Sequence, residues 1–242
     1  MLEMLLTVSF ISIFLGACLQ SSIGIGFSII AVPSIIFLFG IDIAIPLLLA
    51  LNFIVSLFSI DYRNILKRDK LIIYAIFGCT VGVILGIWLY GSLSEKQILT
   101  LISVLMLSGI LTVLTDIQLK ISPWVFAVLF FVIGVSAVWT AVPGPLMAFA
   151  LLASGKSADE VSVSIQPLAL IVYGLSLLFH LNLNPNFDLN NSEFYNLIMI
   201  VVAGAILGQR LRIKMSNKMK SRAIITLSTV SAMIIFTRVL NL

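Results

Sequence analysis

The stretch "QSSIGIGFSIIAVP", residues 20–33, opens with an amide and two hydroxyl side chains, contains two glycines and ends at a proline, yet it lies inside a long apolar run. Backbone N–H and C=O groups in hydrocarbon must find partners, so irregular backbone is tolerated there only where protein or a wet cavity surrounds it. We therefore expect this stretch to form the broken tip of a hairpin that enters a membrane and turns back.

The composition predicts an all-α, polytopic integral membrane protein. Of the 242 residues, 61% are hydrophobic and only 10% are charged, whereas a soluble domain carries about 25% charged residues. The basic residues lie in short loops between apolar runs, as is usual for membrane proteins, so we expect no nucleic-acid partner. Two cysteines and one histidine, His180, suggest neither a disulfide framework nor a multi-histidine metal or haem centre, and we expect no cofactor.

Two of the eight apolar runs are too long for one crossing, which takes about 20 residues of helix. The runs cover about 4–39, 42–60, 71–91, 97–115, 123–153, 160–181, 194–209 and 223–240. Both long runs, 4–39 and 123–153, carry glycine and proline near the middle. We expect each of them to form a hairpin of two arms, which gives ten helical segments in all.

Charged loops predict the orientation in the membrane. The loops 61–70 and 210–222 hold four and six basic residues, whereas the loop 182–193 has none. The positive-inside rule places the first two in the cytoplasm. Counting crossings then puts both termini outside a multi-pass cell-membrane protein, with 12 of the 14 Lys and Arg residues inside and only Lys96 and Arg238 outside.

Two halves of the chain resemble each other. "AVP" at 31–33 recurs at 141–143, and "GVILG" at 82–86 recurs as "GAILG" at 204–208. We expect a single membrane transport domain, 1–242, built from internal repeats 1–116 and 121–242. Each repeat would be a broken-helix hairpin plus three transmembrane helices, and the second would insert upside down. This inverted-topology repeat is a common plan for secondary transporters.

Two inverted hairpins would bring their broken tips together near the middle of the membrane. Free N–H groups and a partial positive charge at helix N-termini bind anions there without Lys or Arg. The acids lie at or near run ends or in loops, so the interior offers neutral donors, which suit a small anion. The candidate substrate-binding residues are Gln20, Ser21, Ser22, Gly24, Gly26, Ser28, Asn52, Ser136, Trp139, Thr140 and Gln166, and the expected structural breakers are Pro33, Pro143, Gly144 and Pro145.

Each candidate also has a structural interpretation. Gly24 and Gly26 could serve close helix packing, and serines often bond back to their own helix. The amides of Gln20, Asn52 and Gln166 could serve as packing contacts or bonds between helices. Trp139 could be a core residue or an interfacial anchor, and His180 is expected at a membrane edge.

Several motifs resemble the TauE/SafE sulfite exporter family, also called the toluene-sulfonate uptake permeases. They are "LQSSIGIGFSIIAVP", "AIPLLLALN" and "YRNILKRDK" in the first half, and "VIGVSAVWTAVPGPLMAFALLASG", "VSVSIQPLA" and "GAILGQRLRIKMS" in the second. The resemblance spans nearly the whole chain and implies transport of sulfite, sulfonates or related organic anions. Many members carry three glycines at the first tip and glycines at the second, whereas this chain has Gly24-Ile25-Gly26 and Ser136-Ala137-Val138-Trp139.

These observations predict a secondary anion transporter, with export the expected direction, that works by alternating access. The sequence shows no Walker A motif for ATP. A passive anion channel or a subunit of a transport complex remains the alternative. An intramembrane enzyme is disfavoured, because the one histidine lies at a predicted outer edge with no matching serine motif. The expected partners are a small anionic substrate and membrane lipid, and a homodimer is compatible with this plan.

Overall fold

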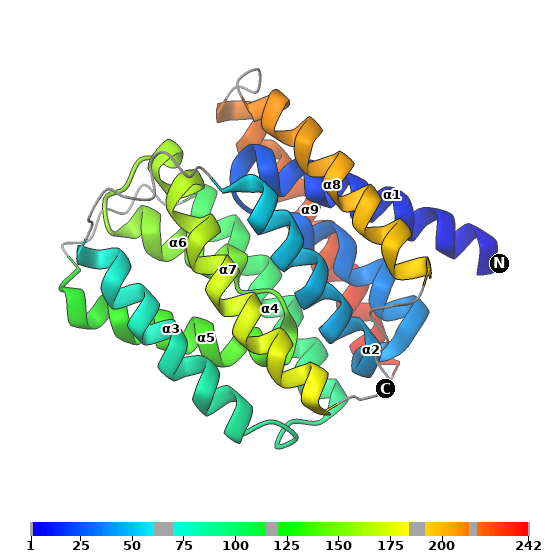
Figure 1. The fold of residues 1–242 in the computed structure, drawn as a ribbon, viewed down its shortest axis with the longest axis horizontal. Coiled ribbons are helices and arrows are strands. Elements are labelled where there is room, and N and C mark those ends of the chain that lie inside the picture. Colours follow the sequence, from blue (N-terminus) through cyan, green and yellow to red (C-terminus); the bar gives the residue numbers. More distant parts are fainter. Residues whose placement is uncertain (1, 61–69, 115–120, 184–191, 213–216, 242) are drawn as a thin grey trace.

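The computed structural model describes residues 2–60, 70–114, 121–183, 192–212 and 217–241, and in these ranges the secondary structure is entirely helical. Outside the described residues lie 61–69 of the basic loop 61–70, 213–216 of the basic loop 210–222, and 184–191 of the loop 182–193. Figure 1 shows the helices packed as one bundle. The helices are α1 (Leu2–Ile23), α2 (Phe27–Ser59), α3 (Lys70–Trp88), α4 (Glu95–Leu114), α5 (Pro123–Thr140), α6 (Gly144–Ala153), α7 (Ala158–Leu183), α8 (Ser192–Arg212) and α9 (Asn217–Leu240).

The helices have the length and polarity of a polytopic membrane protein, as the composition predicted. Within the described part of the chain, α1, α2, α3, α5, α7 and α8 are long and apolar enough to cross a bilayer. The 19 residues of α3, for example, extend about 28 Å, close to the thickness of the hydrocarbon core. The apolar helix α6 and the apolar part of α9, Ile225–Leu240, are shorter.

Helix α2 is two helical segments joined at Gly40. This glycine has φ 71° and ψ 173°, the one non-helical conformation inside α2. Residues 27–39 and 41–59 are therefore separate arms, which confirms the boundary predicted between the apolar runs 4–39 and 42–60. The predicted break at Pro33 is wrong, because the helix continues through this residue. A proline inside a helix removes only one ladder hydrogen bond, and the buried surroundings of Pro33 hold the helix intact.

The first long run folds as a hairpin. The hydroxyls of Ser12 and Ser34 lie 2.6 Å apart, so α1 and the first arm of α2 run side by side. The turn between them contains Gly24 with φ 103° and Gly26 with φ 133°. Backbone with such positive φ angles strongly favours glycine, which explains why both glycines lie at the turn.

The second long run is broken between α5 and α6. Ala141 has φ 54°, the one positive φ of a non-glycine residue in the described chain. Two local bonds hold it: its N–H donates to the Ala137 carbonyl over 3.0 Å, and the next N–H, of Val142, donates to the Thr140 hydroxyl over 3.1 Å. Pro143 precedes α6, which begins with Gly144 and Pro145.

Each half of the chain packs a glycine-bearing helix against the hairpin of the other half. On one side of the molecule α3 lies on α5, and on the other side α8 lies on α1 (Figure 1). A Cβ added at Gly82 would overlap the Phe131 carbonyl oxygen of α5, and one added at Gly208 would overlap the Cys18 carbonyl oxygen of α1. The small residues thus let the backbones touch. Between these pairs, α2 packs on α7 and α4 on α9.

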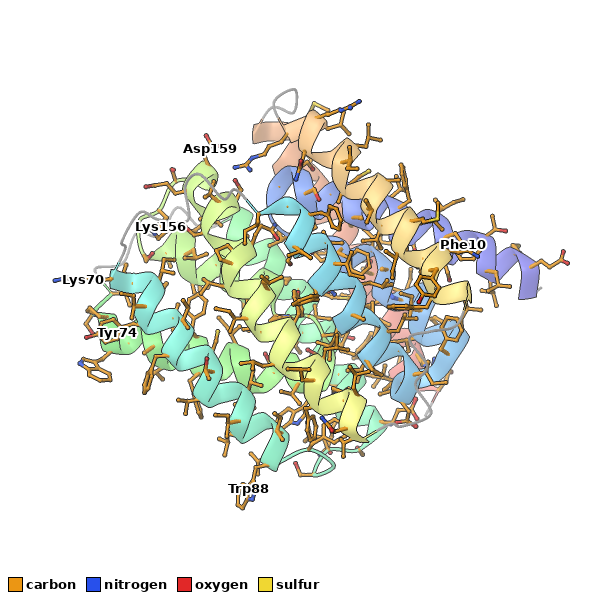
Figure 2. The ribbon with its side chains drawn as sticks, in the orientation of Figure 1. Phe10, Lys70, Tyr74, Trp88, Lys156 and Asp159 are labelled. Atoms are coloured by element: carbon orange, nitrogen blue, oxygen red, sulfur yellow. The ribbon has the colours of Figure 1, made fainter. Side chains whose placement is uncertain are left out.

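The two ends of the bundle differ in chemistry. Figure 2 shows Lys70, Lys156 and Asp159 along one edge of the molecule and Trp88 at the far end of α3. We call these the Lys70 end and the Trp88 end. The Lys70 end also carries the edge-on aromatic pair of Tyr74 and Trp124, whose ring centroids lie 5.3 Å apart.

Candidate functional site

The two breaks meet inside the protein. The Ser28 hydroxyl, in the first turn of α2, donates to the Ala141 carbonyl over 2.7 Å and accepts from Asn52 Nδ2 over 3.0 Å. The side chain of Ile25 lies 3.7 Å from where a Cβ would stand on Gly144. Residues 24–28 and 140–144 are therefore in contact although they lie more than 100 positions apart in the chain, and we call this region the junction.

Two helices begin at the junction, so their N-termini lie there. Helix α2 begins after Gly26 and α6 after Pro143, and neither cap residue supplies a side-chain hydrogen bond. The first N–H groups of a helix have no carbonyl partner within it and carry a partial positive charge. One of them, the N–H of Phe27, donates to Gln20 Oε1 over 3.3 Å. The junction thus combines two positive helix ends without any charged side chain.

Side chains from neighbouring helices hold the first break in place. Gln20 Nε2 donates to the Ser56 hydroxyl over 3.3 Å, which ties α1 to the second arm of α2. Gln166 Nε2, on α7, reaches the carbonyls of Gln20 and Gly24 over 3.4 and 3.3 Å. The five residues whose side chains bond here and at Ser28 are each at most 4% exposed, so the junction is closed to solvent in this state; they are Gln20, Ser28, Asn52, Ser56 and Gln166.

Several predicted donors are occupied by other bonds. The hydroxyls of Ser22, Ser136 and Thr140 donate back to the carbonyls of their own helices, at Leu19, Ile133 and Ser136. Ser21 pairs with Ser59 at 2.5 Å, and Trp139 Nε1 donates to the Gly86 carbonyl over 3.1 Å. In this state the polar side-chain groups of these residues are therefore bonded to other parts of the protein and shape the breaks.

Two buried amide oxygens near the junction have no hydrogen-bond partner. These atoms are Asn52 Oδ1 and Gln166 Oε1, on residues that are 0% and 2% exposed. Leaving a buried acceptor unpaired costs about 1–3 kcal/mol, so such atoms are uncommon and call for an explanation.

Tyr173 is a site residue that the sequence analysis did not select. It is buried beside Ser28, and its hydroxyl lies 3.9 Å from the Cβ position of Gly144. The spacing in the sequence could have identified it: Gln166 and Tyr173 are seven residues apart, which puts them on one face of α7.

A polar cavity of about 320 Å³ lies at the Trp88 end. Arg238 closes one wall: its guanidinium donates to the Ile36 carbonyl over 2.7 Å and pairs with Glu95 at 3.2 Å. Trp139, two residues before the left-handed Ala141, also lines this cavity. Burial, and after it the nearby Asp42 carboxylate, raise the pKa of Tyr90, so this phenol stays neutral at physiological pH.

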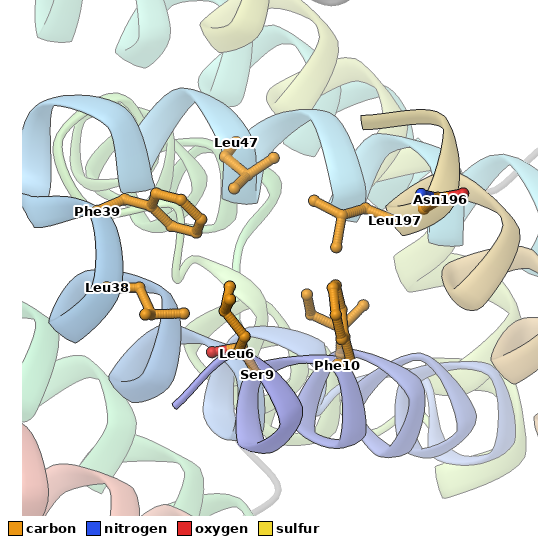
Figure 3. A pocket seen from close by; sticks show the side chains of 9 residues that line it. Leu6, Ser9, Phe10, Leu38, Phe39, Leu47, Asn196 and Leu197 are labelled. Atoms are coloured by element: carbon orange, nitrogen blue, oxygen red, sulfur yellow. The ribbon is translucent and has the colours of Figure 1, made fainter. Parts of the chain in front are cut away.

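A second cavity, of about 130 Å³, is apolar (Figure 3). Phe10 of α1, Phe39 of α2 and Leu197 of α8 point toward one another across it. With only Ser9 and Asn196 as polar lining residues, it offers an ion little to bind, and we assign it no part in the site.

At the Lys70 end, Arg212 was interpreted from the sequence only as an orientation signal. Its guanidinium bonds to the Ser162 hydroxyl, and the backbone of Ser162 lies 3.0 Å from the Cβ position of Gly24. Arg212 and Arg238 therefore stand on opposite sides of the junction. His180, which was expected at a membrane edge, lies close to the C-terminal end of α7 and is fully buried there, with Nε2 at 2.9 Å from the Val138 carbonyl.

Replacing Ser28 with alanine is expected to lower the free energy of unfolding by about 1–3 kcal/mol, because Ala141 and Asn52 both lose their shared partner in a buried site. Thermal unfolding of the purified protein in detergent measures this loss. Ser22→Ala is the matched control, since that hydroxyl bonds only within its own helix and its loss should change stability by less. Equal losses in the two variants would contradict a bridging role for Ser28.

Comparison with known proteins gives one match. The profile of a family described as "Sulfite exporter TauE/SafE" matches residues 9–235. The comparisons with curated proteins and with solved structures found no match. Among the described residues there is no group of three or more His, Cys, Asp or Glu side chains that could hold a metal ion.

Proposed function

This chain belongs to the sulfite exporter TauE/SafE family, and on that premise we propose that it is a secondary transporter that exports a small sulfur-containing anion, such as sulfite or an organosulfonate. The observation that carries the proposal is the junction. The N-termini of α2 and α6 meet there in a buried, uncharged region, and this arrangement is suited to a small anion. A membrane potential that is negative inside would drive the anion outward by about 2.3 kcal/mol per charge per 100 mV.

We propose that the anion crosses by alternating access around the junction. The closed junction would correspond to an occluded state, in which neither end admits solvent. Opening at the Trp88 end would break the contacts of Arg238 with Ile36 and Glu95. Opening at the Lys70 end would break the bond of Arg212 to Ser162 and that between Ser21 and Ser59. In this mechanism the contacts at the Trp88 end and those at the Lys70 end would break in turn, so that only one end is open at a time.

The packing of the helices supports the proposal that residues 1–116 and 121–242 are inverted repeats. Helices α3 and α8, which carry the matching "GVILG" and "GAILG" motifs, each lie on the first hairpin arm of the opposite half. Gly24 and Ala141, which follow those arms, both have positive φ angles. Two related halves of this kind could exchange their conformations during transport.

Flux into liposomes tests the proposed function. We expect purified protein in proteoliposomes to carry at least one of sulfite, thiosulfate, ethanesulfonate and 2-hydroxyethanesulfonate with saturable kinetics, and empty liposomes to carry none of the sulfonates. Planar-bilayer recording of the same protein separates a carrier from a channel, because a channel would give single-channel currents. The absence of saturable flux for every anion in the panel would reject the proposal.

The proposed orientation can be tested with two matched serine-to-cysteine variants. Ser92, next to the Trp88 end, and Ser157, next to the Lys70 end, are both exposed. In intact cells we expect a membrane-impermeant maleimide to label Ser92→Cys, and to label Ser157→Cys only after lysis. The native Cys18 and Cys79 are buried and should give little background. The reverse labelling pattern would place the Trp88 end in the cytoplasm.

A further inference from the structure

The orientations of the two unpartnered amides are fixed by their neighbours. Asn52 Nδ2 lies 2.8 Å from the Leu48 carbonyl, and Gln166 Nε2 lies near the carbonyls of Gln20 and Gly24. A carbonyl oxygen can only accept, so the atom facing it must be the NH₂ group of the amide. Rotating either amide would put two oxygens against each other. The free atoms are therefore oxygens in both residues.

Both free oxygens adjoin the junction. The amide of Asn52 also bonds to Ser28, in the first turn of α2, and the amide of Gln166 bonds to Gly24, at the turn itself. The amide groups that carry these oxygens are therefore both hydrogen-bonded to the segment that contains the first break and the N-terminus of α2. Asn52 belongs to the first half of the chain and Gln166 to the second.

An anion alone cannot satisfy these two atoms. The N–H groups at the starts of α2 and α6 would bind its negative oxygens, but Asn52 Oδ1 and Gln166 Oε1 are acceptors and need a donor. A ligand that pairs with every group at the junction must offer acceptors at one end and a donor at the other.

We propose that the ligand of the junction is a small anion that carries its own hydrogen-bond donor, such as a hydroxyl group, which Asn52 and Gln166 accept. This inference rests on the proposed function and deepens it by naming the substrate class. The sulfonate or sulfite oxygens would face the helix N-termini, while the donor would face the amide oxygens. Because one amide comes from each half, such a ligand would also bridge the two halves.

Two sulfonates that differ by one hydroxyl group test the inference. We expect 2-hydroxyethanesulfonate to bind the purified wild-type protein about tenfold more tightly than ethanesulfonate, the range for one or two net hydrogen bonds. Isothermal titration with each compound measures this ratio. In Asn52→Leu and Gln166→Leu the ratio should fall toward one. The control Ser103→Ala should keep it, because that buried hydroxyl belongs to α4 and donates to the Leu99 carbonyl of its own helix.

Equal affinities of wild-type protein for the two sulfonates would overturn the inference, and this comparison does not depend on whether a variant folds. Anion transport would then still stand, with water as the partner of the two oxygens. Binding of neither sulfonate would overturn the inference as well. The flux assay with the full anion panel decides separately whether the transport proposal survives.

Discussion

Replacing Gly24 with alanine is expected to reduce anion flux in proteoliposomes at least tenfold while the protein still inserts into the membrane. Gly24 has φ 103°, a conformation that is strained for any residue with a Cβ. The added Cβ would also stand 3.0 Å from the Ser162 backbone and 3.1 Å from the Ile165 side chain. The turn would have to move away from α7, and it would carry the N-terminus of α2 with it.

Gly155→Ala is the matched control for this prediction. Gly155 also has a positive φ, 89°, but no atom lies within 4 Å of its Cβ position. The Gly155→Ala variant should therefore have the backbone strain without a collision of the new Cβ with its neighbours, and its anion flux should stay near that of the wild type. If both variants lost flux equally, strain alone would explain the loss, and the contact between the first break and α7 would have no special role.

Replacing Gly82 with alanine is expected to destabilise the protein by about 3 kcal/mol or more, at the upper end of the cost of overpacking a core. The new Cβ would overlap the Phe131 carbonyl oxygen, which belongs to the backbone and cannot turn aside. Helices α3 and α5 would have to separate along their whole contact. Thermal unfolding in detergent and the yield of folded protein measure the effect.

Val81→Leu is the control for Gly82→Ala, because it adds one carbon at the neighbouring position, where the side chain is 39% exposed. We expect a change in stability within about 0.5 kcal/mol there, as for other surface substitutions. A similar stability of the Gly82→Ala and Val81→Leu variants would mean that α3 and α5 can slide apart without cost, contrary to the packing described above.

The sequence predicted the helical segments well, because their signals are local. Apolar runs of about 20 residues identify crossings, and the joint at Gly40 follows from the end of one run and the start of the next. The glycines of the first turn were likewise visible, since Gly24 and Gly26 occur in a polar stretch within apolar sequence. Pro33 misled the analysis, because a proline can remain inside a helix that tertiary packing supports.

The details of the site depended on contacts that no local pattern encodes. The left-handed conformation of Ala141 is maintained by bonds to Ala137 and by the neighbouring Thr140 hydroxyl, and its carbonyl is bound by Ser28 from the other half of the chain. The tertiary structure also determines which hydroxyls donate to their own helix and which bond to another helix. Gln166 was selected as a polar residue, but only its neighbours determine that its oxygen is the free atom.

The exchange of packing partners between halves has a consequence for how the protein is made. Helix α3 presents its glycines to α5, so after α3 leaves the ribosome its contact surface has no partner until residues 89–122 have been added and α5 follows. The surface of α1 that contacts α8 stays without this partner still longer, until α8 is synthesised. The nascent first half must therefore rest against lipid or the insertion machinery, and the bundle can close only near the end of translation.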